Sequence, residues 1–135
     1  MALDNQQVLE RLRPNRRADD LDIFVMSAAG EFPHNLTAES PAGDIEPAWS
    51  PDGSRIAFAT WREQDKDIYS MSPDGTDLVQ LTSSTLGEDQ PVYSPDGLRV
   101  AFVERTPERR EVLVLNTMIP PAQEGLTTRL TWSTA

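Results

Sequence analysis

A seven-residue motif occurs twice in this chain and constrains its fold more than any other feature. Residues 47–53 read PAWSPDG, and residues 91–97, which begin 44 positions later, read PVYSPDG. The similarity continues past the motif, because residues 55–58 (RIAF) are matched by residues 99–102 (RVAF). A sequence that repeats at a fixed period of roughly 20–50 residues is typical of stacked structural units rather than of one irregular domain.

A second motif repeats with nearly the same period. Residues 22–27 (DIFVMS) are matched 45 positions later by residues 67–72 (DIYSMS), and more weakly by residues 111–116 (EVLVLN). The first two copies are each followed by a glycine and then by a Leu-Thr pair. Two interleaved motifs with a shared period indicate that one structural unit occupies about 44 residues.

Both motifs predict β-hairpins. In Ser-Pro-Asp-Gly, Pro fixes φ at the second position of the turn, Asp suits the third, and Gly accepts a positive φ at the end. The turn at residues 50–53 lies between two apolar segments, and a second turn at residues 73–75 (PDG) follows the strand 67–72. Two hairpins per repeat give a four-stranded antiparallel sheet, which is the unit of a β-propeller blade. We therefore predict an all-β fold.

The strands of these sheets are expected to be covered on both faces. Residues 56–59 (IAFA) and 100–103 (VAFV) are apolar at every position. A strand with one face in water alternates between apolar and polar residues, whereas a strand between two layers does not. The pattern predicts blades that stack face to face.

These motifs resemble the WD-like Pro-Asp-Gly repeat of the TolB family. That repeat has an Asp-Ile-Tyr-x-Met strand, an Asp-Gly turn and a Leu-Thr strand end, followed by Pro-x-Trp-Ser-Pro-Asp-Gly and Ile-Ala-Phe. The resemblance covers residues 21 to about 116, and the middle copy is nearly ideal. It implies a β-propeller that acts as a non-catalytic protein–protein interaction scaffold. It also implies a periplasmic location, where the TolB propeller binds a peptidoglycan-associated lipoprotein.

The chain is predicted to hold about two and a half blades within residues 21–135. These are a half blade of two outer strands, a full blade and a degenerate blade, at residues 22–37, 45–82 and 89–131. In the degenerate blade the last strand ends at one of two Leu-Thr pairs, 126–127 or 130–131. Closed propellers have roughly four to eight blades, so this is an incomplete ring. Either several chains self-associate to complete it, or the chain is a piece of a longer protein.

Residues 1–20 do not fit the repeat and are predicted to form an N-terminal arm. Asp4 and Gln7 are spaced as in a helix capping box, and Pro14 would end a helix. A short apolar stripe lies between them, at Val8, Leu9 and Leu12. The arm is expected to be either a short helix or a disordered segment.

Composition excludes several classes of function. The chain has 22 acidic and 12 basic residues, and an acidic surface repels the phosphate backbone of nucleic acids. It contains no Cys, which excludes disulfides and Cys-ligated zinc. No apolar run is long enough to span a membrane. The N-terminus lacks the apolar core of a signal peptide, so the chain as given is expected in the cytoplasm, in contrast to the periplasm that the resemblance implies.

The sequence also predicts that the chain is not an enzyme. A hydrolytic triad needs a positioned base, and the one histidine, His34, lies in an expected hairpin turn beside Pro33. No Gly-x-Ser-x-Gly nucleophile motif occurs. An alternative comes from the gating propeller of prolyl-oligopeptidase-type serine peptidases, which has similar repeats. A fragment of such a protein would continue into an α/β-hydrolase domain.

Candidate binding residues recur with the repeat. Two acids, Asp44 and Glu88, each precede a motif proline by three positions. With Glu46 and Asp89 beside them they would surround one mouth of a propeller channel, where carboxylates can bind Ca²⁺ or a basic partner segment. Their alternative role is to cap loop amides or to face water. The aromatic pair Trp49 and Tyr93 can contact a partner or pack between blades. No cofactor other than Ca²⁺ is suggested.

Overall fold

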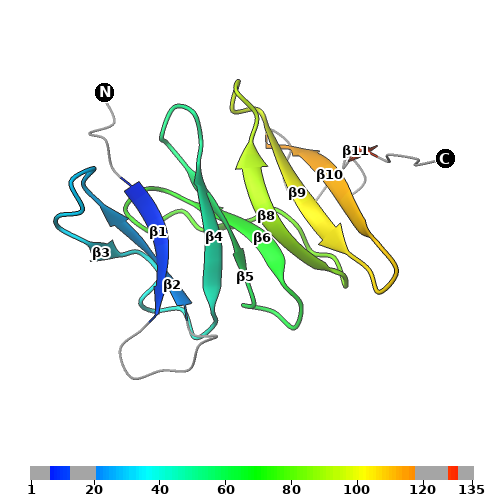
Figure 1. Ribbon diagram of the computed structural model, residues 1–135, viewed down its shortest axis with the longest axis horizontal. Coiled ribbons are helices and arrows are strands. Elements are labelled where there is room, and N and C mark those ends of the chain that lie inside the picture. The colour runs from blue at the N-terminus through cyan, green and yellow to red at the C-terminus, as the bar shows by residue number, and fades with distance from the viewer. Residues whose placement is uncertain (1–6, 13–20, 118–127, 131–135) are drawn as a thin grey trace.

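The computed structural model describes residues 7–12, 21–117 and 128–130, and these form three antiparallel sheets stacked side by side (Figure 1). Blade 1 comprises β1 (Gln7–Leu12), β2 (Leu21–Met26) and β3 (His34–Asn35). Blade 2 comprises β4 (Asp44–Trp49), β5 (Ile56–Thr60), β6 (Asp67–Met71) and β7 (Val79–Gln80). Blade 3 comprises β8 (Gly87–Tyr93), β9 (Arg99–Arg105), β10 (Arg110–Asn116) and β11 (Thr128–Leu130).

The all-β prediction is confirmed, and so is the incomplete ring. The described segments contain strands and turns but no helix, and therefore no helix long and apolar enough to cross a membrane. Within each complete blade the strands are hydrogen-bonded in chain order, from β4 to β7 and from β8 to β11. The stack of blades stays open, with blade 1 and blade 3 at its two ends (Figure 1).

The Ser-Pro-Asp-Gly turns form as the sequence predicts. In the first, the amide of Gly53 donates to the carbonyl of Ser50 at 2.9 Å, and φ at Gly53 is positive. The carboxylate of Asp52 accepts bonds from the hydroxyl of Ser50 at 2.8 Å and from the amide of Ser54 at 3.0 Å. The turn at residues 94–97 repeats this arrangement. The recurrence of these aspartates is thus explained by turn structure.

The N-terminal arm was predicted wrongly over Gln7–Leu12, which is neither a helix nor disordered. These residues form strand β1, which pairs with β2 in antiparallel register. A helix this short is marginal in water, whereas the edge of β2 offers a row of unpaired amides and carbonyls. Residues 22–37 supply two strands of blade 1, β2 and β3, and the arm adds the third. The rest of residues 1–20 lies outside the described segments.

The last strand of blade 3 distinguishes between the two Leu-Thr pairs. In blade 2, Tyr69 of β6 is opposite Gln80, the residue before Leu81. In blade 3 the equivalent Leu113 of β10 is opposite Arg129, the residue before Leu130. The backbone register thus gives Leu130 the place of Leu81, which favours the pair at 130–131 although Thr131 lies outside the described residues. The pair at 126–127 also lies outside them.

The first strand of each complete blade bends at the same point. The pairing of β4 with β5 shifts between Ile45 and Ala48, and that of β8 with β9 shifts at the equivalent place. Glu46 and Gln90, the residues before the motif prolines, have φ of 54° and 57°. Proline cannot donate a hydrogen bond to the neighbouring strand, so a local irregularity accommodates it. The bend turns the side chain of Glu46 toward the next blade.

A hydrophobic cluster fills each of the two seams between blades. The seam between blades 1 and 2 buries Ile23, Val25, Ile56, Phe58, Tyr69 and Met71, with Val8, Leu36 and Trp49 packed around them. The seam between blades 2 and 3 buries Ala59, Ile68, Val100, Phe102, Leu113 and Leu115, with Ile45, Leu81 and Tyr93 around them. Strand β5 is buried at every position because blade 2 has a neighbour on both sides. Face-to-face stacking is therefore the basis of the core.

Candidate functional site

The alternation of strand direction gives the stack two distinct ends. The turns between first and second strands and between third and fourth strands lie at one end, here named the turn end. The loops that follow the second and fourth strands lie at the other, here named the loop end. The candidate acids occupy the start of β4 and β8, which places them at the loop end.

Asp44 is fully buried in the seam between blades 1 and 2. Its Oδ1 lies 3.4 Å from Nε of Arg62. Burial raises the pKa of Asp44, while the hydroxyl of Thr60 and the charge of Arg62 act in the opposite direction. The guanidinium of Arg62 also lies 5.8 Å from the ring centroid of Phe58. Asp44 is therefore paired inside the protein with Arg62, whose guanidinium lies over a ring of the hydrophobic cluster.

Glu88 occupies the equivalent position in blade 3, and its side chain is 3% exposed. Burial raises the pKa of Glu88 to about 7, a hydrogen bond with Thr82 opposes this, and the charges of Asp67 and Glu104 add to it. Burial also raises the pKa of Asp67, to about 6. The charges of Asp67 and Glu104 thus lie close enough to the buried carboxyl group of Glu88 to disfavour its ionisation.

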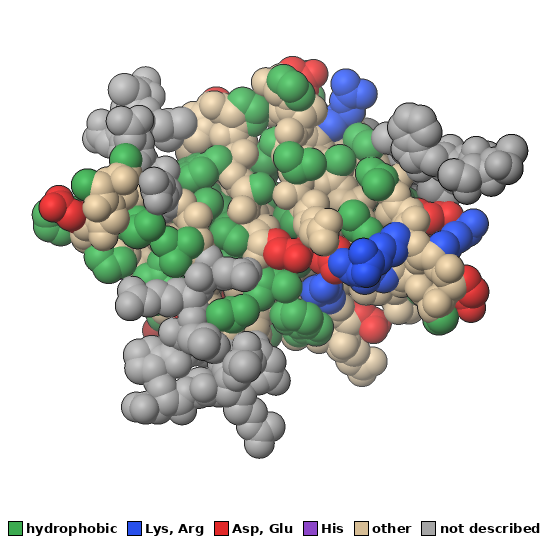
Figure 2. All heavy atoms as spheres, viewed as in Figure 1, with side chains coloured by type: hydrophobic (Ala, Val, Ile, Leu, Met, Phe, Trp, Pro, Cys, Tyr) green, Lys and Arg blue, Asp and Glu red, His purple; other side chains and the backbone are tan. Residues whose placement is uncertain are grey.

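Asp89 and Glu46 belong to one polar network, which links strands β4, β8 and β9. Asp89 is 1% exposed, and its Oδ2 lies 2.7 Å from Nζ of Lys66 and 2.5 Å from Nε of Arg105. Burial would raise the pKa of Asp89, but the bonds and charges of Arg105 and Lys66 together lower it. Glu46 accepts a bond from the amide of Gln90 at 2.6 Å, which ties β4 to β8. Figure 2 shows basic side chains beside acidic ones over blades 2 and 3.

The structure therefore separates the acids that the sequence groups together. Asp44 and Glu88 lie in different seams with different neighbours, while Glu46 and Asp89 join one network. The described part of the chain has no group of three or more His, Cys, Asp or Glu side chains placed to hold a metal ion. Calcium binding stays a prediction, and so does contact of these acids with a basic partner, for which Asp44 and Glu88 offer almost no exposed surface.

Trp49 and Tyr93 occupy equivalent places beside the two hydrophobic clusters. Trp49 packs against the cluster between blades 1 and 2, and Tyr93 against the cluster between blades 2 and 3. Both are half-buried. Packing between blades accounts for their recurrence, and contact with a partner through their remaining exposed surface stays a prediction.

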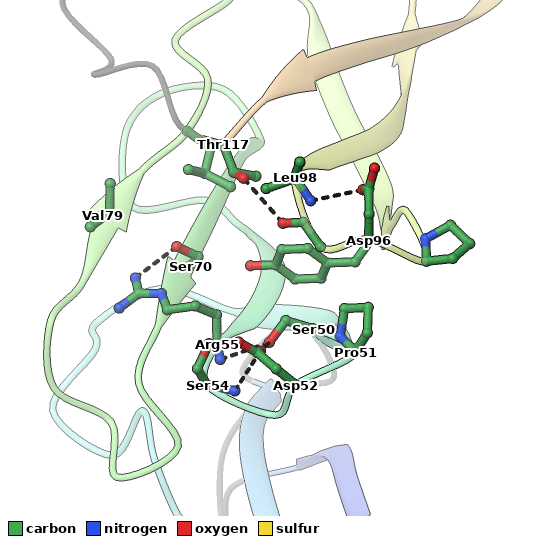
Figure 3. Close-up of a pocket in the computed structure, with 14 residues that line it drawn as sticks. Ser50, Pro51, Asp52, Ser54, Arg55, Ser70, Val79, Asp96, Leu98 and Thr117 are labelled. Carbon is green, nitrogen blue, oxygen red and sulfur yellow. Dashed lines mark hydrogen bonds between the residues drawn. The ribbon is translucent and has the colours of Figure 1, made fainter.

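A groove at the turn end was missed by the sequence analysis. It has a volume of about 650 Å³ and lies between the Ser-Pro-Asp-Gly turns of blades 2 and 3 (Figure 3). Arg55 lines this groove, and its Nη2 donates to Oγ of Ser70 and to the carbonyl of Asp77, both at 2.7 Å. Tyr93 and Leu98 line the groove as well. The signal was present in the sequence, because two identical turns in adjacent blades must lie side by side.

The one histidine of the chain lies on a strand of blade 1. His34 is exposed at the start of β3, where it pairs with Val25 across the sheet, and not in the turn itself. Within the described segments, no hydrogen bond joins His34 to a serine, a threonine or a carboxylate.

Stacked antiparallel blades with turns at fixed places define this chain as part of a β-propeller. The chain belongs to the TolB β-propeller domain family, whose model matches residues 9–131. The Tol-Pal system protein TolB of Syntrophus aciditrophicus is 41% identical over 46 residues, which are 34% of this chain and 10% of that protein.

Solved structures show the same fold. The putative TolB from Agrobacterium tumefaciens is 27% identical with a TM-score of 0.68, over 84% of this chain and 39% of that chain. The β-propeller domain of the Trilobed protease from Pyrococcus furiosus is 13% identical with a TM-score of 0.66, over 96% of this chain and 36% of that chain. The chain therefore spans well under half the length of these relatives.

Proposed function

We propose that the chain is a non-catalytic protein–protein interaction module. The observation that carries the proposal is that the recurring polar residues have partners inside the fold. The turn aspartates bind turn amides and hydroxyls, and the buried acids meet arginine, lysine or one another. Because turn geometry and packing account for these residues, none of them needs a catalytic role, and the exposed surface of the blades is left for binding.

Membership in the TolB family supports a protein as the partner. The relative from Syntrophus aciditrophicus carries the name of the Tol-Pal system, which suggests a peptidoglycan-associated lipoprotein as the first partner to test. A periplasmic location is part of the same proposal. The formal charge of −10 argues against nucleic acid as a partner.

The proposal is tested in two measurements on the purified chain. Calorimetric titration with the soluble domain of the peptidoglycan-associated lipoprotein from the same organism should show saturable binding. Incubation with peptide and ester substrates should show no turnover by either the original chain or the His34→Ala variant. Turnover by both proteins at equal rate and in proportion to enzyme concentration would contradict the proposal, because it would require a catalytic site elsewhere.

A second candidate is the gating propeller of a serine peptidase. The likeness to the Trilobed protease propeller supports it at the level of fold alone. The coding sequence around this chain separates the two candidates, because a peptidase would continue into a domain with a Gly-x-Ser-x-Gly motif.

A further inference from the structure

The groove at the turn end is lined by apolar side chains that reach water. Val79 of β7 lines it from blade 2, and Leu98, directly before β9, lines it from blade 3. These two residues are 37% and 47% exposed. The groove volume of about 650 Å³ lies within the range of ligand-binding clefts, roughly 300–1,000 Å³. An apolar side chain of a partner can therefore be buried here.

Each Ser-Pro-Asp-Gly turn also places one carboxylate at this groove (Figure 3). The Oδ1 atom of Asp52 accepts bonds from the hydroxyl of Ser50 and from the amide and hydroxyl of Ser54. The Oδ1 atom of Asp96 is used in the same way by a hydroxyl and an amide of its own turn. Described residues donate no hydrogen bond to the Oδ2 atom of either aspartate. Each turn thus uses one carboxylate oxygen for folding and leaves the other available.

The charges around the groove favour a basic partner. Asp52 and Asp96 are exposed, and hydrogen bonds within the turns lower the pKa of both, so both are ionised at neutral pH. Among the described residues that line the groove, Arg55 is the one cation, and its Nη2 is already bonded to a serine and a carbonyl of blade 2. Arg99 acts on the charge of Asp96 from outside the lining. The formal charge of −10 attracts cations to the chain as a whole.

We infer that this groove binds an extended segment of a partner protein in which one apolar side chain lies between two basic ones. The apolar side chain contacts Val79 and Leu98, and the basic side chains pair with the available oxygens of the two turn aspartates. Packed sheets lie about 10 Å apart, and alternate side chains of an extended chain point to the same side. In the pattern basic-x-apolar-x-basic the two basic residues are about 13 Å apart, which matches turns on adjacent blades. The inference rests on the proposed function, to which it adds the chemistry of the bound segment.

A peptide titration followed by NMR tests the inference. The probe is acetyl-Lys-Ser-Leu-Ser-Lys-amide, added to the isotope-labelled chain, and the comparison peptide has Glu in place of both Lys. The Lys peptide is expected to shift the amide signals of residues 52–54, 79 and 96–98 in a saturable way. Its binding should weaken about threefold or more between about 50 and about 500 mM salt, since exposed ion pairs are screened. Equal binding of the Glu peptide, or shifts confined to other residues, would overturn the inference.

Charge substitutions separate the groove from the general acidity of the chain. The double variant Asp52→Asn with Asp96→Asn removes both charges, while the amide oxygens can still accept the turn bonds. It should bind the Lys peptide about fivefold more weakly. The matched control is Asp74→Asn, in the turn between β6 and β7, where the carboxylate accepts equivalent bonds from Thr76 but does not line the groove. The control should bind like the original chain, and an equal loss of binding in both variants would contradict the inference.

A second pair of variants tests the apolar contact. Leu98→Asn should weaken binding of the Lys peptide about fivefold, because less apolar surface is buried. Phe32→Asn is the control, since Phe32 is 83% exposed and does not line the groove. Val79→Thr replaces Leu98→Asn if circular dichroism shows that this variant does not fold. If light scattering showed a dimer that Leu98→Asn converts to a monomer, a second copy would occupy the groove and the inference would be wrong.

The result is separable from that of the proposed function. Binding of the lipoprotein domain without binding of the Lys peptide would overturn the inference about the groove and leave the proposed function standing. Turnover of peptide substrates by a chain that binds the Lys peptide in the groove would contradict the non-catalytic proposal and support the groove as a binding site.

Discussion

At the scale of single residues, the environment shifts the pKa of a turn aspartate and that of a buried glutamate in opposite directions. Asp52 is exposed, and bonds from the amide of Ser54 and the hydroxyls of Ser50 and Ser54 lower its pKa to about 2. Glu88 is buried, and its pKa is raised to about 7. The difference arises because hydrogen bonds to a carboxylate favour the ionised form, while removal from water disfavours it.

Two turn glycines at equivalent positions form a matched pair for mutation. Gly30 and Gly75 have φ of +79° and +87°, but only at Gly75 would an added Cβ meet a backbone atom, the carbonyl oxygen of Leu36 at 2.8 Å. Gly30→Ala is expected to lower the free energy of unfolding by about 1 kcal/mol through the positive φ. Gly75→Ala should cost about 2–3 kcal/mol, since blade 1 must also move. Equal losses in urea unfolding would contradict the close approach of Leu36 to the Gly75 turn.

Glu88 gives the fold a dependence on pH. Its pKa is about 7 in the fold, compared with 4.5 for an unperturbed glutamate, so between these values the folded state binds more protons than the unfolded state. The free energy of unfolding should therefore fall as the pH rises from 4.5 to about 7, by on the order of 2 kcal/mol from this residue. Glu88→Gln should remove most of the decline between about pH 6 and 7. At lower pH, Asp67, whose pKa is about 6, contributes to the decline as well.

Urea unfolding across this pH range measures the effect. Glu108→Gln, at an exposed position in the loop after β9, is the matched control and should keep the slope of the original chain. A Glu88→Gln variant with an unchanged slope would show that Glu88 ionises in the fold as it does in water.

At the scale of elements, strand β1 shows how an ambiguous segment is decided by its neighbours. Val8 and Leu9 fit a helical stripe as well as a strand, and the capping pattern favours the helix. Pairing with β2 instead puts Val8 against the cluster between blades 1 and 2, and Leu9 on the opposite face. An open strand edge nearby offers several hydrogen bonds that an isolated short helix cannot replace.

Adjacent substitutions in β1 test this assignment. Val8→Asp should lower the free energy of unfolding by about 2 kcal/mol or more, because a carboxylate is placed against a hydrophobic cluster. Leu9→Asp should cost clearly less in the monomer, since Leu9 does not face that cluster. Thermal melting of both variants at low protein concentration is the measurement. Equal effects would argue against the alternation of a strand at this place.

At the scale of the whole molecule, position in the stack decides the burial of a repeat residue. Strand β5 of the middle blade is buried at every position, while in its equivalent β9 buried residues alternate with exposed or half-buried ones. Both strands are apolar on both faces in sequence. They differ because blade 2 has neighbours on both sides, whereas the described part of the chain gives blade 3 only one.

Equivalent positions in two blades test this difference. Ile68 is fully buried and Val112, its repeat equivalent, is 37% exposed. Ile68→Ala should cost about 2–4 kcal/mol through the loss of buried contacts and the cavity left behind. Val112→Ala should cost less than about 1 kcal/mol at concentrations where the chain is monomeric. A larger loss for Val112→Ala under these conditions would mean that another part of the chain covers its face.

The sequence by itself determined the repeat, the hairpins and the class of fold. Motifs such as Ser-Pro-Asp-Gly act within a few residues, through fixed φ values and local hydrogen bonds, so they can be read without knowledge of distant contacts. The same locality explains why the role of Asp52 and Asp96 in their turns was predicted correctly. The equivalence of Trp49 and Tyr93 was also visible, because it follows from the period alone.

Only the tertiary structure decided how the recurring acids are used and where the stack is open. Asp44 and Glu88 have equivalent places in the repeat, yet Asp44 meets Arg62 of the loop after β5, while Glu88 meets Asp67 of β6 and Glu104 of β9. The strand at Gln7–Leu12 and the partial exposure of Val112 on blade 3 depend likewise on which surfaces have neighbours. Burial is a property of the whole assembly of blades, so no local pattern in the sequence can specify it.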